Sequence, residues 1–403
     1  MPPAAEGTSD PTVRHNALVL GGGGARAAYQ AGVLQYVGEA FPDAPMSILT
    51  GVSAGSINAA HLADDPVSWN DATRRLAACW TDLCTQRVVE PRSLWTLGTQ
   101  LLRGAARPKQ SLLDTRPLRV FLRSRLQTGA HERLTGVREN LNAGRLRALA
   151  LSTSNYATMQ TVTWTEGCAI ENWARPNRIG RQAELTLDHV MASAALPLLF
   201  PAVQLDDAWH GDGGVRLLDP LAPAIHLGAD RLFVISTRYE RSRSEADTPS
   251  SSAYPSPLQI AGMLVNVLML DLVEHDAAVL RRINRLVRRL RPEERGRLRP
   301  IDLLIIRPSV DLGALAQDYT LELGRTLGTV LNVLRDRQQG TPDWLSMLLF
   351  EPGYIERLLE IGYADARRQH ERIGAFFART PAAMPSLHTP VPGSPSAQSS
   401  DSS

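Results

Sequence analysis

The segment of residues 47–60 limits the possible folds of this chain more than any other stretch. A short apolar run leads into Gly51-Val52-Ser53-Ala54-Gly55, and small residues able to start a helix follow. This is the nucleophile-elbow layout, in which a turn between a strand and a helix lifts a serine hydroxyl above the end of a sheet. Side chains in place of Gly51 and Gly55 would collide with the strand or the helix. Plain turns also match the five-residue pattern, so support must come from elsewhere in the chain.

A glycine loop about 30 residues upstream provides the first support. The apolar run of residues 17–20 is typical of a buried parallel strand, Gly21-Gly22-Gly23-Gly24 follows, and residues 25–37 have helical spacing. Backbone amides in such a loop, together with the start of a helix, form an anion-binding nest.

Four interpretations of this loop have to be compared. A dinucleotide site needs an acidic residue at the end of a second strand, and neither Glu39 nor Asp43 is so placed. A P-loop is excluded because no Gly-Lys-Ser/Thr follows. An oxyanion hole serving Ser53 is favoured over a plain βα turn, because the elbow follows at the distance expected of a βαβ unit.

The order of the remaining patterns predicts an α/β protein with a mostly parallel sheet and added C-terminal helices. Strands are expected at residues 148–154, 159–164, 231–236 and 301–306, a short helix at 187–197, and a tight loop at 209–214. We expect a flexible N-terminus at 1–15 and a catalytic domain at 16–225, with a helical insertion at about 66–146. The part at 226–378 is expected to complete the fold and to include a mobile loop at 240–257. A disordered tail is expected at 379–403.

A serine nucleophile needs a base. A Ser–acid–His order would use His226, His275, His370 or His388, but none of these four lies in a glycine-framed loop at the end of a strand. Asp212 lies between Gly211 and Gly213-Gly214, where a carboxylate can approach another backbone closely. An Asp-Gly turn with a local hydrogen bond is the alternative explanation.

Together these three stretches resemble the motifs of the patatin-like phospholipase family. Residues 22–27 (Gly-Gly-Gly-Ala-Arg-Ala) are similar to its glycine-rich motif, residues 51–55 to its nucleophile motif, and Asp212-Gly213-Gly214 to its Asp-Gly-Gly/Ala motif. Residues 192–201 resemble the segment that usually precedes that aspartate. The resemblance covers about residues 16–225. One difference is Ala27, which stands where the family usually has glycine.

The resemblance implies a three-layer α/β/α fold and a serine acyl hydrolase that cleaves lipid esters, phospholipase A-like or lysophospholipase-like, without metal or cofactor. Ser53 would be the nucleophile and Asp212 the proton acceptor, with no histidine in the set. The oxyanion would be held by amides of Gly22, Gly23 and Gly24, near Arg26. The rival hypothesis is a catalytically silent protein that binds lipids or anions in the glycine nest.

Composition bears on partners and location. The formal net charge of +2 does not favour nucleic-acid binding, and three cysteines without CxxC spacing indicate neither a disulfide scaffold nor a zinc site. We find no secretory-signal pattern and no apolar run of membrane-spanning length, so the expected location is the cytoplasm or a membrane periphery.

Residues 279–290 predict a helix with an apolar face and an arginine face. A packing helix is the favoured explanation and membrane contact the alternative. The oligomeric state stays open.

Overall fold

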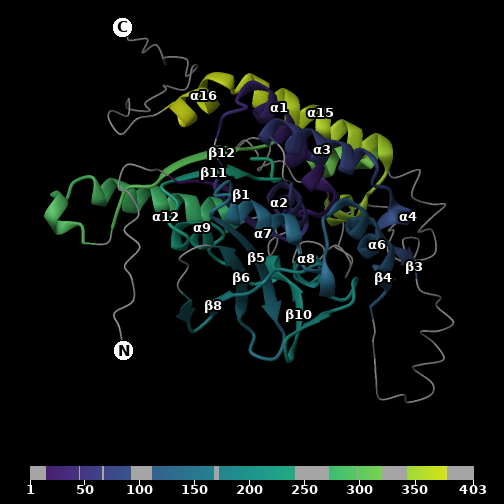
Figure 1. The fold of residues 1–403 in the computed structure, drawn as a ribbon. Helices are drawn as coiled ribbons and strands as arrows, with labels where there is room; N and C mark the ends of the chain where they lie inside the picture. The colour runs from purple at the N-terminus through teal and green to yellow at the C-terminus, as the bar shows by residue number, and fades with distance from the viewer. Residues whose placement is uncertain are drawn as a thin grey trace, which may run out of the picture.

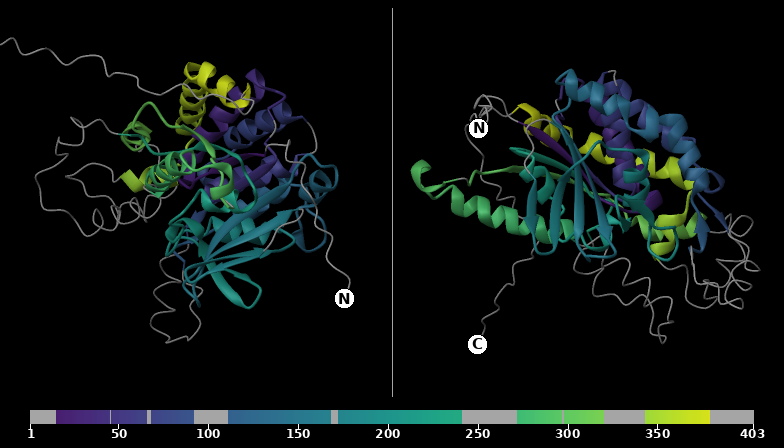
Figure 2. Two further views of the ribbon diagram at one scale, coloured as in Figure 1. Left: turned by 90° about the vertical axis from the view of Figure 1, so that its left-hand side faces the viewer. Right: turned by 60° about the horizontal axis from the view of Figure 1, so that its bottom comes forward.

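The computed structural model describes residues 15–44, 46–65, 68–91, 111–167, 172–240, 272–296, 298–319 and 343–378. A central sheet with helices on both of its faces gives the three-layer α/β/α fold that the sequence predicts (Figures 1 and 2). The sheet order is β12-β11-β1-β2-β5-β6-β8-β7, with β10 paired to both β5 and β9. The predicted N-terminus (1–15, apart from residue 15), loop 240–257 (apart from residue 240), tail 379–403 and Cys168 lie outside the described residues.

Five neighbouring strands form the parallel half of the sheet. Their residues are apolar in continuous runs because helices cover both faces of this half. Every strand in it is joined to its neighbours by a regular parallel register. In sheet order the five strands are β12 (Asp302–Ile306), β11 (Arg231–Ile235), β1 (Asn16–Leu20), β2 (Ile48–Val52) and β5 (Ala148–Asn155).

The other half of the sheet is largely antiparallel. It consists of β6 (Thr161–Gly167), β8 (Arg178–Gln182), β7 (Trp173–Arg175), β10 (Ala208–Asp212) and β9 (Val203–Leu205). The prediction of a tight loop at 209–214 is wrong for its first four residues, because residues 208–212 pair with β5 and β9 as a strand. Only at Gly213 does the chain turn, into a short 3-10 helix.

Two separate apolar cores follow from the alternation of side chains along the strands. Helices α1, α2, α3, α15 and α16 cover one face, and α9 and α12 cover the other (Figure 2). The helices are α1 (Ala28–Ala40), α2 (Ala54–Asp64), α3 (Trp69–Thr81), α4 (Thr85–Val88), α6 (Arg116–Arg125), α7 (Thr135–Asn142), α8 (Leu187–Ser193), α9 (Ala222–His226), α12 (Leu272–Val287), α13 (Leu312–Leu315), α15 (Pro352–Arg368) and α16 (His370–Ala378), and β3 (Glu90–Pro91) pairs with β4 (Leu113–Asp114).

Helix α12 packs on the sheet through a narrower stripe than the sequence predicts. Of its predicted apolar face, only Leu280 and Val287 are buried. The other four apolar residues are exposed beside the arginines; they are Val279, Ile283, Leu286 and Leu290. Among the described residues, we find no helix with the length and apolarity needed to cross a bilayer.

Candidate active site

Ser53 occupies the turn between β2 and α2 in the strained backbone conformation expected of a nucleophile elbow. Its φ is 56° and its ψ is −133°, a region that non-glycine residues seldom adopt. Two glycines make the turn possible. A Cβ on Gly51 would lie 2.5 Å from the carbonyl oxygen of Gly55, and one on Gly55 would lie 2.4 Å from the carbonyl oxygens of Leu20 and Gly21. Helix α2 therefore begins in direct contact with the end of β1.

Strand β5 brings Asp212 to Ser53; β5 and β10 lie side by side in Figure 1. The last residue of β2, Val52, pairs with Ser152 of β5, and Asp212 of β10 pairs with the next residue, Thr153. Strand β6 already occupies the other edge of β5 as far as Ser154, so β10 must lie on the edge where β2 ends. The two strands meet end to end along β5, and consecutive residues of a strand are only about 3.3 Å apart.

The Asp212 carboxyl group is completely buried. Its Oδ1 accepts a hydrogen bond from the Gly214 amide at 2.8 Å. Burial raises the pKa of the carboxyl from its ordinary value of 3.8 to about 7, although the nearby Ser53 hydroxyl and the Gly214 amide act to lower it. No group among the described residues completes a hydrogen bond of normal geometry to Oδ2. Oδ2 can therefore still accept a hydrogen bond.

The backbone around Asp212 is fixed from three directions. Its amide donates to the Ala195 carbonyl at 2.9 Å, and its carbonyl accepts from the Ser154 hydroxyl at 2.8 Å. Gly213 packs so closely on β5 that an added Cβ would lie 2.1 Å from the Ser152 carbonyl oxygen. These contacts hold the carboxyl at the end of β2 without help from the side chain itself.

The glycine loop lies directly beside the serine, since a Cβ on Gly22 would lie 3.0 Å from Ser53 Cβ and 3.5 Å from Oγ. The Gly21 carbonyl accepts from Gln30 Nε2 at 2.9 Å, and the Gly22 carbonyl from the Thr237 hydroxyl at 2.9 Å. The peptide bonds that join Gly21 to Gly22 and Gly22 to Gly23 are trans. The N–H groups of Gly22 and Gly23 therefore point in the direction opposite to the carbonyl oxygens that Gln30 and Thr237 hold. The hydrogen bonds to the two carbonyls thus fix the orientation of the loop, and the amides of Gly22 and Gly23 lie on its other side.

Gly23 and Gly24 adopt positive φ values of 142° and 56°. Gly24 also lies against the Met347 backbone, where a Cβ would come within 2.1 Å of the carbonyl oxygen. Arg26 is buried in the 3-10 helix that follows, and its Nε donates to the Ser346 hydroxyl at 2.6 Å. The loop is therefore clamped against residues more than 300 positions later in the chain.

Sequence reasoning missed two sets of supporting residues. The Ser53 amide donates to the hydroxyl of buried Ser193 at 3.1 Å, and that hydroxyl donates to the Ser152 carbonyl at 2.7 Å. A second chain runs from Trp80 Nε1 to Asn58 Oδ1 at 2.7 Å, and from Asn58 Nδ2 to Gln30 Oε1 at 2.9 Å. The only sequence signal for Ser193 was its place in the segment that precedes the aspartate.

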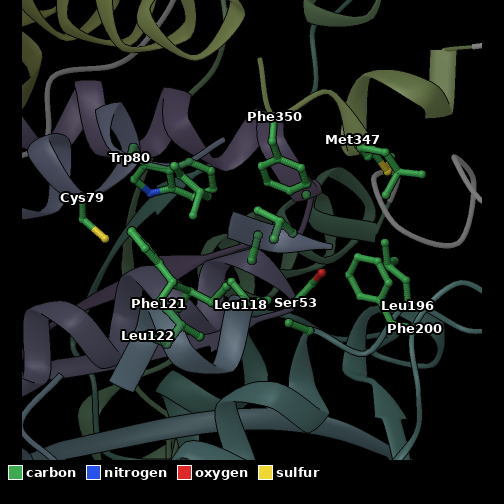
Figure 3. Close-up of a pocket in the computed structure, with 17 residues that line it drawn as sticks. Ser53, Cys79, Trp80, Leu118, Phe121, Leu122, Leu196, Phe200, Met347 and Phe350 are labelled. Carbon is green, nitrogen blue, oxygen red and sulfur yellow. The ribbon is translucent and has the colours of Figure 1, made fainter. Parts of the chain in front are cut away.

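Two cavities share the side chain of Phe200 in their walls. The first, about 30 Å³ in volume, has Ser53 in its wall and is otherwise nearly all apolar (Figure 3). Trp80, Cys79 and Phe121 lie on one side of Ser53, and Leu196 and Phe200 on the other. The second is a wider cleft of about 990 Å³ with both polar and apolar walls. Phe200 lines both cavities.

The histidines weighed as bases lie elsewhere. His226 stacks on Trp173, His370 stacks on Phe41, and His275 is exposed on α12. His388 lies outside the described residues. Within the described part of the chain, no three His, Cys, Asp or Glu residues are grouped as metal ligands would be.

A strained serine above a parallel sheet, a glycine loop beside it and a buried carboxyl facing it together define the class of α/β proteins with a nucleophile elbow. Comparison with family models is more specific. The model described as patatin-like phospholipase matches residues 18–225, just over half of the chain, and the chain therefore belongs to the patatin-like phospholipase family. Comparison with curated proteins found no match.

Solved structures similar to this chain include VipD from Legionella pneumophila, at 14% identity and a TM-score of 0.37, over 89% of this chain and 67% of that one. Human GIVD cytosolic phospholipase A2 in complex with methyl gamma-linolenyl fluorophosphonate matches at 13% identity and a TM-score of 0.44, over 91% of this chain. Human GIVD cytosolic phospholipase A2 without that compound matches at 12% identity, a TM-score of 0.43 and the same coverage of this chain. This chain spans 58% and 60% of the two human chains.

Proposed function

We propose that this protein is a serine hydrolase of lipid acyl esters that works through a Ser53–Asp212 dyad. The observation that carries the proposal is the position of a completely buried carboxyl group, with a pKa near 7, beside a strained serine. Membership of the patatin-like phospholipase family supports the reaction class and the lipid nature of the substrate.

The Ser53 hydroxyl attacks the ester carbonyl while Asp212 accepts its proton. An ordinary aspartate is too weak a base for this step, but a carboxyl with a pKa near 7 is matched to neutral pH. The proton then passes to the departing alcohol, which leaves an acyl-enzyme on Ser53. Asp212 activates water in the same way to release the fatty acid.

The glycine loop supplies the oxyanion site in this mechanism. Gln30 and Thr237 hold the carbonyls of Gly21 and Gly22, so the amides of Gly22 and Gly23 are oriented before substrate binds. Gly24 extends the loop, and Arg26 adds its positive charge to the same segment. The motif glycines Gly51, Gly55, Gly213 and Gly214 serve by allowing close packing or by donating to Asp212.

The two cavities suit the two arms of a lipid ester. The apolar walls of the cavity at Ser53 match the acyl part next to the carbonyl in chemical character, and the wider cleft has room for the alcohol part. A phospholipid or a lysophospholipid is the proposed substrate, and the residues of the dyad require neither a metal nor an organic cofactor for this chemistry.

Substitution of the dyad tests the function. Ser53→Ala and Asp212→Asn should each lower hydrolysis of p-nitrophenyl butyrate by at least about a thousandfold, with circular dichroism unchanged. Ser124→Ala and Asp206→Asn are matched controls, because both residues are exposed, and should keep full activity. Full activity in either dyad variant would refute the mechanism.

Labelling by a fluorophosphonate probe separates hydrolysis from the rival function. An activated Ser53 reacts covalently with the probe, and Ser53→Ala does not. A wild-type protein that stays unlabelled but binds lipid would instead be a catalytically silent lipid-binding protein.

A further inference from the structure

Exposed apolar side chains gather at the opening of the wide cleft. We propose that four of them dock the protein on a lipid surface, and this proposal rests on the proposed function because it concerns how a lipid ester reaches Ser53. We call these four residues the mouth rim; they are Leu112, Tyr156, Leu198 and Trp209.

Leu198 is the most informative member of the mouth rim. Its side chain is 83% exposed and its backbone has a φ of 66°, a conformation that is strained for a bulky residue. Two backbone hydrogen bonds fix it there, from the Leu112 amide to the Leu198 carbonyl and from the Leu113 amide to the Leu199 carbonyl. The strained backbone presents this leucine to solvent, and an apolar surface is the medium in which its side chain gains free energy.

The mouth rim is continuous with the route to the serine. Tyr156, Leu198 and Trp209 line the wide cleft, and Phe200 forms part of both this cleft and the cavity at Ser53. Trp209 is 49% exposed and Tyr156 43%, and these two residue types favour the boundary between water and lipid. A lipid leaving a surface docked on the rim would enter the cleft directly.

The charges around the cleft favour docking by apolar contact. Arg116 pairs with Asp114, and Arg119 pairs with Asp188 and Glu132. Arg123 also lies 3.8 Å from Glu132, so these three described arginines balance the three carboxylates, and their charges do not favour anionic over zwitterionic lipid. We therefore commit to a zwitterionic phosphatidylcholine surface as the occupant.

Helix α12 offers a contrasting surface. Its exposed apolar residues lie beside Arg281, Arg282, Arg285 and Arg289, an arrangement that would select anionic lipid. However, Glu274 near the start of α12 pairs with Arg307, just after β12, and Asn284 near its end donates to the carbonyl of Ile301, just before β12. The last turns of α12 therefore lie at the amino ends of the parallel strands, opposite the carboxyl ends where Ser53 lies. Docking through α12 would hold Ser53, at the carboxyl ends of the strands, away from the lipid.

Co-sedimentation with phosphatidylcholine vesicles tests the rim, with Ser53→Ala as the parent protein so that the vesicles stay intact. Adding Leu198→Ser and Trp209→Ser should weaken binding about tenfold or more. Adding Ile283→Ser and Leu286→Ser, the matched pair on α12, should leave binding within about twofold. Binding by the parent should persist between about 0.1 M and 1 M NaCl, across which screening shortens from about 10 Å to 3 Å.

Activity provides a second measurement on protein with an intact Ser53. The ratio of phosphatidylcholine hydrolysis on vesicles to p-nitrophenyl butyrate hydrolysis in solution should fall about tenfold in the Leu198→Ser/Trp209→Ser variant. Thermal unfolding of each variant identifies any that fails to fold, and Leu198→Asn then serves as a milder substitution.

Three results would overturn the docking proposal: undiminished vesicle binding by the rim variant, loss of binding in the α12 variant, or binding of the parent only to anionic vesicles. A parent that binds no vesicle at all would also refute it and would leave a protein partner as the occupant of the rim. Absence of soluble-ester hydrolysis by the wild type would refute the proposed function instead, and the sedimentation result would still decide the docking.

Discussion

The environment of Asp212 determines the pH at which this carboxyl can act as a base. Transfer into a completely buried site penalises the charged form, and the single amide hydrogen bond from Gly214 does not offset that penalty. The result is a carboxyl that exchanges a proton near neutral pH. Its basicity is a property of the site and not of the residue type.

A pH profile should show this basicity. Because only the ionised carboxyl accepts the serine proton, kcat/KM for a soluble ester should rise with pH and level off above about 7. Below that value it should fall about tenfold per pH unit. Initial rates of acid release from pH about 5 to 9 measure this. A flat profile across that range would show that another group is the base.

The same burial should make Asp212 unfavourable for stability. Since its folded pKa lies above its unfolded value, the contribution of Asp212 is most favourable below about pH 3.8 and is lost as pH rises to about 7. Asp212→Asn, which cannot ionise, should therefore be more stable than wild type, and the difference should grow by up to about 3 kcal/mol between pH 5 and pH 8. Urea unfolding at the two pH values measures the difference.

At the scale of elements, contact between β1 and α2 determines where the elbow can form. Gly55→Ala would drive a methyl group into the carbonyl oxygens of Leu20 and Gly21, and should cost about 1–3 kcal/mol and displace Ser53. Gly21→Ala is the matched control, because nothing lies within 4 Å of the added carbon, and its effect should stay within about 0.5 kcal/mol. Thermal melts and esterase rates of both variants measure this. Equal effects would mean that helix packing does not position the elbow.

The sequence could predict those elements whose signals are local. The strands before the glycine loop and before the elbow, the elbow itself and the short helix that begins at Leu187 can all be recognised from the order of apolar and small residues in the sequence. Strand β10 does not, because Trp209-His210-Gly211-Asp212 lacks an alternating pattern and its pairing with β5 joins residues more than 50 positions apart. Ser193 and Asn58 were missed for a related reason. They are ordinary polar residues in helices, and only the folded chain shows what they contact.

At the scale of the whole molecule, helix α15 belongs to the same core as the motifs although the family match ends at residue 225. Its backbone lies so close to α1 that a Cβ on Gly362 would come within 2.2 Å of the Tyr29 carbonyl oxygen. Tyr354, Ile355 and Leu358 are fully buried. The catalytic half therefore lacks part of its core without this helix.

Truncation tests this dependence. A chain that ends at Glu240 should fail to unfold cooperatively and should lack esterase activity, since it exposes the apolar surface that α15 and α16 cover. A chain that ends at Ala378 keeps every described contact and should match the full-length protein in both measurements. An active, cooperatively folded protein from the shorter chain would show that the first 240 residues form an independent domain.

The pairing of both β2 and β10 with β5 has a consequence for how such a protein can change over evolution. The separation of Ser53 and Asp212, the proposed nucleophile and base, depends on two neighbouring residues, Ser152 and Thr153, and not on the hundred or so residues between Ser53 and β5. One extra residue between Ser152 and Thr153 would move the base by about 3.3 Å and turn it to the other face of the sheet. Insertions elsewhere in that interval leave the pair unaltered. Changes in length between the two motifs can therefore alter the cavity walls while the geometry of the proposed dyad is kept.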